Sequence, residues 1–116
     1  MSLKGIKANF KFWLETEDGY VFGEGLFKLL SKISALGTLT AAANALDMSY
    51  RQAWGKIKNV EKRLGTTLIE THKGGDKGGG GSELTREGRA FLDEYYRLRE
   101  AYAQASRMLS SKDKAS

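Results

Sequence analysis

At 116 residues, 41% of them hydrophobic and 28% charged, the chain fits one soluble globular domain, or one such domain with a helical extension. No apolar run approaches the roughly 18 residues that span a bilayer and no segment resembles a signal peptide, so we expect a cytoplasmic protein. Cysteine is absent and His72 is the single histidine, which excludes a disulfide framework and a His-pair metal site, while the net charge of +5 favours a polyanionic partner.

The N-terminal segment has the pattern of a β-hairpin. Apolar and polar residues alternate from Ile6 to Glu15, the period of two expected of a strand with one buried face. The turn pair Asp18-Gly19 follows, and Tyr20–Phe22 is expected to return as a short strand. Because an isolated hairpin is only marginally stable, its Phe-rich face must dock on the helical body or on a second subunit.

The segment Glu24–Leu36 places apolar residues at helical spacing over a wide arc, and Gly37 is expected to end this helix. From there to Gly65 the chain divides into two further helical patterns. Thr38 and Ser49 precede them, and the hydroxyl groups of both can cap free backbone N–H groups. The stretch therefore predicts a helix-turn-helix.

Small and apolar residues support this prediction. The first of the two helices has so little side-chain bulk that another helix can cross it closely, because it contains Ala41, Ala42, Ala43 and Ala45. The second has a single apolar stripe at helical spacing, formed by Ala53, Ile57, Val60 and Leu64.

The opposite face of the second helix is polar and basic. Its side chains can hydrogen-bond base edges or phosphates, and they are Tyr50, Arg51, Gln52, Lys56, Asn59 and Arg63. An ordinary amphipathic helix with a solvated face produces the same pattern. Because the Ala-rich helix, the capped turn and the basic surplus occur together here, we favour DNA binding.

The residues after the helix-turn-helix have the pattern of a wing. Thr66–His72 is β-branched and predicts a strand, Lys73–Ser82 predicts a Gly-rich loop, and Glu83–Thr85 predicts a second short strand. Such a wing can place Lys73 and Lys77 against phosphates or in the minor groove.

The Gly-rich loop has two alternative interpretations. Gly75–Ser82 nearly meets the P-loop pattern, but Gly81 stands where the phosphate-binding lysine is required, which disfavours nucleotide binding. The glycines also fit a disordered spacer.

Thr85 is expected to cap a long helix that runs from Arg86 to about Leu109, followed by a frayed tail over 110–116. Small and apolar residues recur in it at the spacing of a coiled-coil seam, at Gly88, Phe91, Tyr95, Leu98, Tyr102, Ala105 and Leu109. Such a long seam exceeds what a small monomer can cover, so we expect a homodimer. The alternative is that the hairpin and first helix of the same chain cover it.

Two motifs are unusually specific: S-Y-R-x-A-W at Ser49–Trp54, and G-G-x-K-G-G-G-G followed by L-T-x-x-G at Gly74–Gly88. With the helical pattern before them, they make Gly37–Gly88 resemble the DNA-binding domain of ModE-type transcriptional regulators and, more distantly, the LysR-type winged helix. The resemblance implies an α+β, mainly α, winged helix-turn-helix with an N-terminal β-hairpin, a recognition helix over Ser49–Leu64 and a wing over Leu68–Thr85.

The resemblance also implies a division of the chain and a dimer. Residues 1–84 would form the DNA-binding domain and 85–109 the dimerisation helix. Dimer contacts would come from the first and last helices, at Leu26, Leu30, Phe91, Tyr95, Leu98, Tyr102 and Leu109. The implied role is control of genes for molybdate uptake or molybdenum-dependent enzymes. The C-terminal molybdate-binding modules of full ModE proteins have no counterpart in these residues, so we expect neither molybdate binding nor a cofactor in this chain.

A homodimer of this kind would place two recognition helices in successive major grooves of a pseudo-palindromic operator. We assign base contacts to Tyr50, Arg51, Gln52 and Asn59. Phosphate contacts are assigned to Thr38, Thr40, Ser49, Lys56 and Lys58, with Lys73 and Lys77 from the wing. Trp54 borders the apolar stripe, and we favour packing over a DNA contact for it.

Two other functions stay open, a winged-helix protein-interaction module and a non-specific DNA-binding protein. Enzymatic activity, a catalytic site and a metal site are not expected. The acidic residues near the hairpin turn fit solvated turn residues better than a catalytic carboxylate pair, and they are Glu15, Glu17, Asp18 and Glu24.

Overall fold

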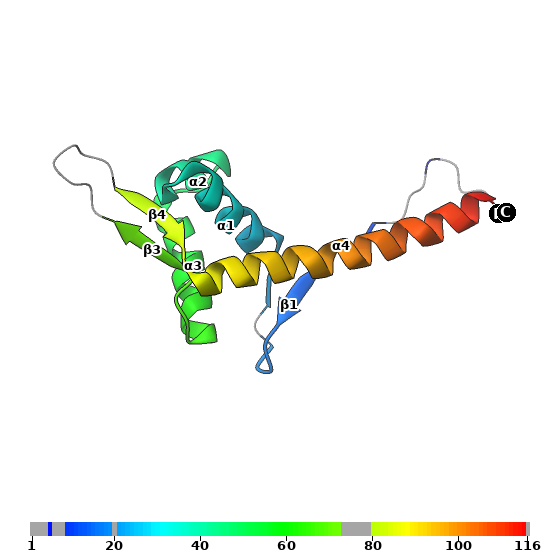
Figure 1. Ribbon diagram of the computed structural model, residues 1–116, viewed down its shortest axis with the longest axis horizontal. Coiled ribbons are helices and arrows are strands. Elements are labelled where there is room, and N and C mark those ends of the chain that lie inside the picture. The colour runs from blue at the N-terminus through cyan, green and yellow to red at the C-terminus, as the bar shows by residue number, and fades with distance from the viewer. Residues whose placement is uncertain (1–4, 6–8, 20, 73–79, 116) are drawn as a thin grey trace.

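A computed structural model describes residues 5, 9–19, 21–72 and 80–115. The molecule is elongated, with principal extents of 65 × 32 × 22 Å, because one long helix runs out from a small helical body (Figure 1). The elements follow the order β1, β2, α1, α2, α3, β3, β4, α4. The expected winged helix-turn-helix with an N-terminal hairpin and a long last helix is confirmed.

The N-terminal hairpin consists of β1 (Trp13–Glu15) and β2 (Val21–Gly23), paired antiparallel. Gly19 makes the turn, as its N–H donates to the carbonyl of Thr16 at 2.9 Å. The expected first strand was too long, since 9–12 lie outside the ladder and 6–8, like Tyr20, lie outside the described residues. The ladder ends where Trp13 faces Gly23, because α1 begins at the next residue and leaves no partner for the preceding segment.

Helices α1 (Glu24–Leu36), α2 (Leu39–Ala45) and α3 (Tyr50–Leu64) form the body, and their starts and stops agree with the predicted caps. Gly37 ends α1 with a left-handed φ of 81°, which glycine adopts without steric cost. Thr38 Oγ1 accepts the N–H of Ala41 at 3.0 Å and caps α2.

The core lies around α1. Leu29, Leu30 and Ile33 are fully buried, as are Ala42 of α2 and Ala53 of α3. The absence of bulk at these two alanines allows the helices of the helix-turn-helix to pack closely, as the sequence predicted. Packing on α1 therefore orients α2 and α3 relative to each other.

The wing consists of β3 (Ile69–His72) and β4 (Gly81–Leu84), paired antiparallel. It is tied to the body where the N–H of Ser82 donates to the carbonyl of Gly37 at 2.7 Å. Lys73 and Lys77, with their expected phosphate contacts, lie outside the described residues, as does most of the glycine run.

Helix α4 (Arg86–Ala115) is capped as expected, since Thr85 Oγ1 accepts the N–H of Gly88 at 3.0 Å. It continues past Leu109, so the expectation of a frayed tail from residue 110 was wrong. No proline and no glycine follow Gly88, and cations near a helix C-terminus favour the helical state.

The first half of the expected seam is covered by the same chain. Tyr95 is fully buried, with its ring 5.2 Å from that of Phe12 and 5.0 Å from that of Phe27, measured between centroids. The hairpin therefore docks on its own α4. Leu26 and Leu30 are 5% and 0% exposed, so together with Tyr95 they are core residues, and their assignment to dimer contacts is corrected.

We predict that Gly88→Ala destabilises the fold by about 1–3 kcal/mol, because an added Cβ would stand 2.1 Å from the carbonyl oxygen of Leu68. Gly25→Ala is the matched control, as its Cβ would meet no atom within 4 Å, and it should be neutral or stabilise by up to about 1 kcal/mol. Urea denaturation followed by circular dichroism measures both. Equal stability of the two variants would contradict the close approach of α4 to Leu68, the residue before β3.

Candidate nucleic-acid interface

Helix α3 buries one side and exposes the other. Ala53, Ile57 and Val60 are at most 2% exposed. On the other side Tyr50 is half-exposed, and Arg51, Gln52, Lys56 and Asn59 are exposed. The predicted division of this helix is confirmed, and its polar side faces solvent.

The N-terminus of α3 is closed by a reciprocal cap. Ser49 Oγ accepts the N–H of Gln52 at 3.0 Å, and Gln52 Oε1 accepts the N–H of Ser49 at 2.9 Å. The S-x-x-Q spacing could have revealed this capping box from the sequence. Because Gln52 would need the same amide oxygen to recognise adenine, the structure favours a capping role over the assigned base contact.

A row of stacked side chains runs along α3. The Tyr50 and Trp54 rings are parallel within 9°, with centroids 6.3 Å apart, and Lys58 Nζ lies 4.4 Å from the Trp54 ring centroid. Trp54 is half-buried and packs on the core, in agreement with the favoured packing role. Lys58 Nζ also lies 2.9 Å from Glu61 Oε1 while 42% of its side chain stays exposed, so the ammonium group pairs within the fold and its assigned phosphate contact stays a prediction.

Glu61 connects α3 to the wing, a link that the sequence analysis missed. Its Oε2 accepts the N–H of Leu68 at 2.7 Å and of Ile69 at 3.2 Å, where β3 begins. Burial by itself would raise the pKa of Glu61, but the hydrogen bonds from Lys58 and from these two amides outweigh it and hold the pKa below 4.5. A lone acidic residue inside a basic helix is the only sequence signal for this contact.

A groove of about 270 Å³ separates the start of α2 from the wing. It is lined by hydroxyl, ring and backbone groups of α2, α3, β3 and β4, among them Thr38, Thr40, Tyr50, Thr71, His72 and Ser82. Thr40 is exposed, whereas Thr38 uses its hydroxyl oxygen as the cap of α2. The groove brings the predicted phosphate-contacting threonines next to Tyr50 and the wing strands.

The far end of α3 is joined to the hairpin. Arg63 Nη1 lies 2.7 Å from Asp18 Oδ2, and both side chains are about half-exposed. Such a surface pair contributes about 0–1 kcal/mol. Arg63 is in the last turn of α3 and therefore lies at the end of the polar face.

The wing also brings together Glu70, His72 and Glu83, whose ligand atoms lie within 4.8 Å of one another. All three are exposed, and His72 Nε2 lies 2.9 Å from Glu83 Oε1. This group is an exposed polar cluster of the wing.

Over the described ranges, no helix combines the length and the apolar character needed to cross a membrane.

The helix-turn-helix, its outward polar face and the paired wing strands define the winged helix-turn-helix class. Residues 25–89 match the family model described as bacterial regulatory helix-turn-helix protein, lysR family. The chain belongs to this family.

Curated relatives include regulators named for molybdenum. The DNA-binding transcriptional dual regulator ModE of Escherichia coli (strain K12) is 34% identical over 85 residues, which cover 73% of this chain and 32% of the relative. The molybdenum transport protein ModE of Azotobacter vinelandii is 30% identical over 99 residues, which cover 85% of this chain and 36% of the relative. The chain therefore spans about a third of the length of these relatives.

Solved structures agree with the fold. The crystal structure of the CbnR DBD–DNA complex superposes with a TM-score of 0.58 at 25% identity, over 77% of this chain and 95% of that one. CbnR, a LysR family transcriptional regulator, superposes with a TM-score of 0.56 at 25% identity, over 75% of this chain and 28% of that one.

We predict that Glu61→Gln lowers the free energy of unfolding by about 1–3 kcal/mol at pH 7, because the charged acceptor of two buried amides is lost. Since the folded pKa is below the unfolded value of 4.5, ionised Glu61 stabilises the fold above that pH, and this contribution disappears as pH falls through the folded pKa. Urea denaturation at pH 7 and pH 3 should show the difference between wild type and variant shrinking.

Glu17→Gln is the control for this experiment, because Glu17 is exposed in the hairpin turn and should change stability by less than about 0.5 kcal/mol. A Glu61→Gln effect as small as this control at pH 7 would remove Glu61 as the link between α3 and the wing.

Proposed function

We propose that this chain is the DNA-binding part of a sequence-specific transcriptional regulator that recognises a pseudo-palindromic operator. The observation that carries the proposal is the outward polar face of α3, where Arg51, Lys56 and Asn59 are exposed while the apolar stripe is buried. Family membership and the net charge of +5 support a nucleic-acid partner. Action on bacterial DNA would place the chain in the cytoplasm.

The exposed side chains of this face would have different roles in DNA binding. Arg51 is suited to guanine, which an arginine binds through two hydrogen bonds, and Asn59 is suited to adenine. Tyr50 is the first residue of α3 and lines the groove, where it offers its ring to bases or sugars. Lys56 and the hydroxyl groups of Thr38, Thr40 and Ser49 would donate hydrogen bonds to phosphates and set the register on the duplex.

The target genes are proposed from the relatives. Several of them are named as ModE or molybdenum transport proteins, so we infer a role in molybdate uptake or molybdenum-enzyme expression. The matched region covers about a third of those relatives, and any response to molybdate within this chain is outside the proposal.

Selection of duplexes from a random pool should return a two-fold-symmetric consensus, and this duplex tests the assignment of Arg51. Arg51→Ala should weaken binding to it by about 1–3 kcal/mol and relax the preference at one base pair per half-site. Arg107→Ala, an exposed arginine on distal α4, is the charge-matched control and should retain base preference. Fluorescence anisotropy at several salt concentrations measures both.

One result would contradict this assignment, and two others would contradict the proposed function. Equal loss of affinity by Arg51→Ala on the consensus and on random duplexes would remove its base-reading role. Binding without sequence preference in the wild type would indicate a non-specific DNA-binding protein, and an affinity for a protein partner that does not change with salt would indicate an interaction module.

We also propose that two copies associate along the second half of α4. Tyr102 and Leu109 are 61% and 66% exposed and continue the seam beyond Tyr95, with the Tyr102 ring 5.5 Å from that of Phe12, and Met108 beside Leu109 is 64% exposed. Phe91 and Leu98 are half-buried and would lie at the edge of this surface.

Leu109→Asp should shift the protein toward the monomer, because a carboxylate would be buried against the partner's apolar side chains. Gln104→Asp adds the same charge to α4 at an exposed position off the seam and should leave the mass unchanged. Sedimentation velocity compares the two variants with the wild type. If the wild type is dimeric and Leu109→Asp stays dimeric, the proposed dimer surface is wrong.

A further inference from the structure

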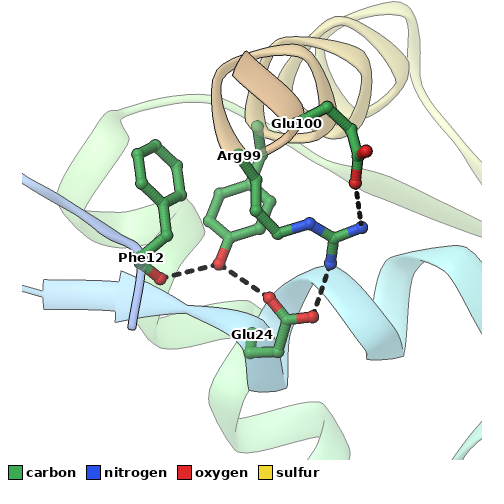
Figure 2. A network of polar contacts seen from close by, with 5 residues as sticks. Phe12, Glu24, Arg99 and Glu100 are labelled. Atoms are coloured by element: carbon green, nitrogen blue, oxygen red, sulfur yellow. Dashed lines mark hydrogen bonds and ion pairs between the residues drawn. The ribbon is translucent and has the colours of Figure 1, made fainter. Parts of the chain in front are cut away.

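Charged side chains gather where the start of α1 meets α4, and there they compensate one another. Arg99 Nη1 lies 2.5 Å from Glu24 Oε1, and Arg99 Nη2 lies 3.5 Å from Glu100 Oε1 (Figure 2). The Tyr95 hydroxyl also donates to Glu24 Oε2 at 3.0 Å. A guanidinium group is permanently charged and has no acceptor atom for a metal. This cluster therefore contains its own cation.

The wing has a cluster of a different kind, in which the group beside the carboxylates is itself a metal ligand. Glu70 of β3 stands directly opposite Glu83 of β4 in the ladder. His72 is two residues from Glu70, so both side chains point to the same face of the wing. The residue opposite His72 is Gly81, which has no side chain, and His72 Nε2 reaches 2.9 Å from Glu83 Oε1.

This register places two like charges face to face. Carboxylates directly opposite each other in an antiparallel pair destabilise it. Glu83 is paired with His72, whereas within the described part of the chain no ion pair involves Glu70. Lys73 and Lys77 follow in the sequence and lie outside the described residues. A cation held between the two carboxylates would remove the repulsion.

The donor set and its spacing select the kind of cation. Imidazole nitrogen suits zinc and related transition metals, whereas Mg²⁺ and Ca²⁺ are held by oxygen ligands. Two ligand atoms of a tetrahedral zinc site are roughly 3.4 Å apart, since each lies about 2.0–2.2 Å from the ion. One pair of ligand atoms here is 2.9 Å apart, and all three lie within 4.8 Å of one another. All three side chains are exposed, so small rotations bring them to the required spacing.

We propose that Glu70, His72 and Glu83 bind one Zn²⁺ or a similar divalent transition-metal ion. The ligands are His72 Nε2 and one oxygen of each carboxylate, and the fourth position is open to water. The single histidine excludes a His-pair site, and the two glutamates supply the missing ligands. The bound ion joins β3 to β4 across the ladder.

A consequence for DNA binding follows, and it rests on the proposed function. His72 also lines the groove between α2 and the wing. Carboxylates beside this groove repel the phosphates of a duplex, and a bound divalent cation compensates them. Zinc should therefore raise the affinity for DNA without changing the base preference.

The metal site is tested without DNA, on the whole chain, by isothermal titration calorimetry with zinc chloride in excess Mg²⁺. One ion should bind per chain. His72→Ala and Glu70→Gln should each weaken zinc by at least about tenfold, because removal of a ligand costs no less than removal of an outer partner. Glu17→Gln removes an exposed carboxylate in the hairpin turn and should bind zinc as the wild type does.

Nuclear magnetic resonance of the one imidazole ring gives an independent reading. Zinc should shift the Nε2 resonance of His72 and leave the proton on Nδ1. Circular dichroism checks that each variant is folded. Equal zinc affinity of Glu70→Gln and Glu17→Gln, or of His72→Ala and the wild type, would overturn the site. Displacement of zinc by Mg²⁺ would overturn it as well, and so would the absence of binding, which is the result if Lys73 or Lys77 already compensates the carboxylates.

The consequence for DNA is tested separately, by fluorescence anisotropy with the selected duplex in zinc and in a chelator. Zinc should tighten binding by roughly two- to fivefold in the wild type and not in His72→Ala. Unchanged DNA affinity with zinc bound would overturn the effect on DNA. Failure to bind any duplex, with zinc still bound, would contradict the proposed function and leave the metal site supported.

Discussion

The arrangement of the molecule depends on the burial of the apolar stripe of α3. Ala53, Ile57 and Val60 lie against the rest of the body, so rotation of the helix about its axis would expose them. Burying an aliphatic side chain is worth about 1.5–3 kcal/mol, and the small side chain at Ala53 lets α2 approach closely. This packing leaves Arg51, Lys56 and Asn59 facing solvent. The candidate interface is thus a consequence of core packing, because the helix has only one face that the core can accept.

A second constraint sets the wing beside that face. Glu61 is the buried acidic residue of a basic helix. Its carboxylate accepts hydrogen bonds from the amides of Leu68 and Ile69, at the start of β3, and Lys58 compensates its charge. The wing is held from the other side by the hydrogen bond between Ser82 and Gly37. The second of these contacts lies at the groove between α2 and the wing, because Ser82 lines it. The proposed dimer surface, by contrast, depends on how α4 packs on the hairpin, where Phe91 contacts Phe22.

Local signals predicted much of this fold. The caps at Thr38 and Ser49 and the stop at Gly37 were readable because each depends on a few neighbouring residues. Contacts between distant segments were not readable in the same way. The seam of α4 shows this, since its spacing does not reveal whether the hairpin or a second subunit covers Tyr95. The length of the first strand also depends on a distant residue, because α1 begins directly after Gly23 and leaves the residues before Trp13 without a strand to pair with.

The sequence predicted the polar face of α3 as a whole. The structure shows which of its side chains already make contacts within the fold. Gln52 and Lys58 have the chemistry of nucleic-acid ligands, but the first caps α3 and the second compensates Glu61. Residue type alone cannot separate these uses, because an amide or an ammonium group serves either one. Lys73 and Lys77 lie outside the described residues, so their phosphate contacts stay predictions.

The most direct test of the account is a map of backbone amide chemical shifts while the protein is titrated with its selected duplex. The largest changes should fall on the first half of α3, at the start of α2 and on the wing strands, with small changes in β1, β2 and the core of α1. Changes concentrated on the hairpin and α4, with α3 unaffected, would contradict it.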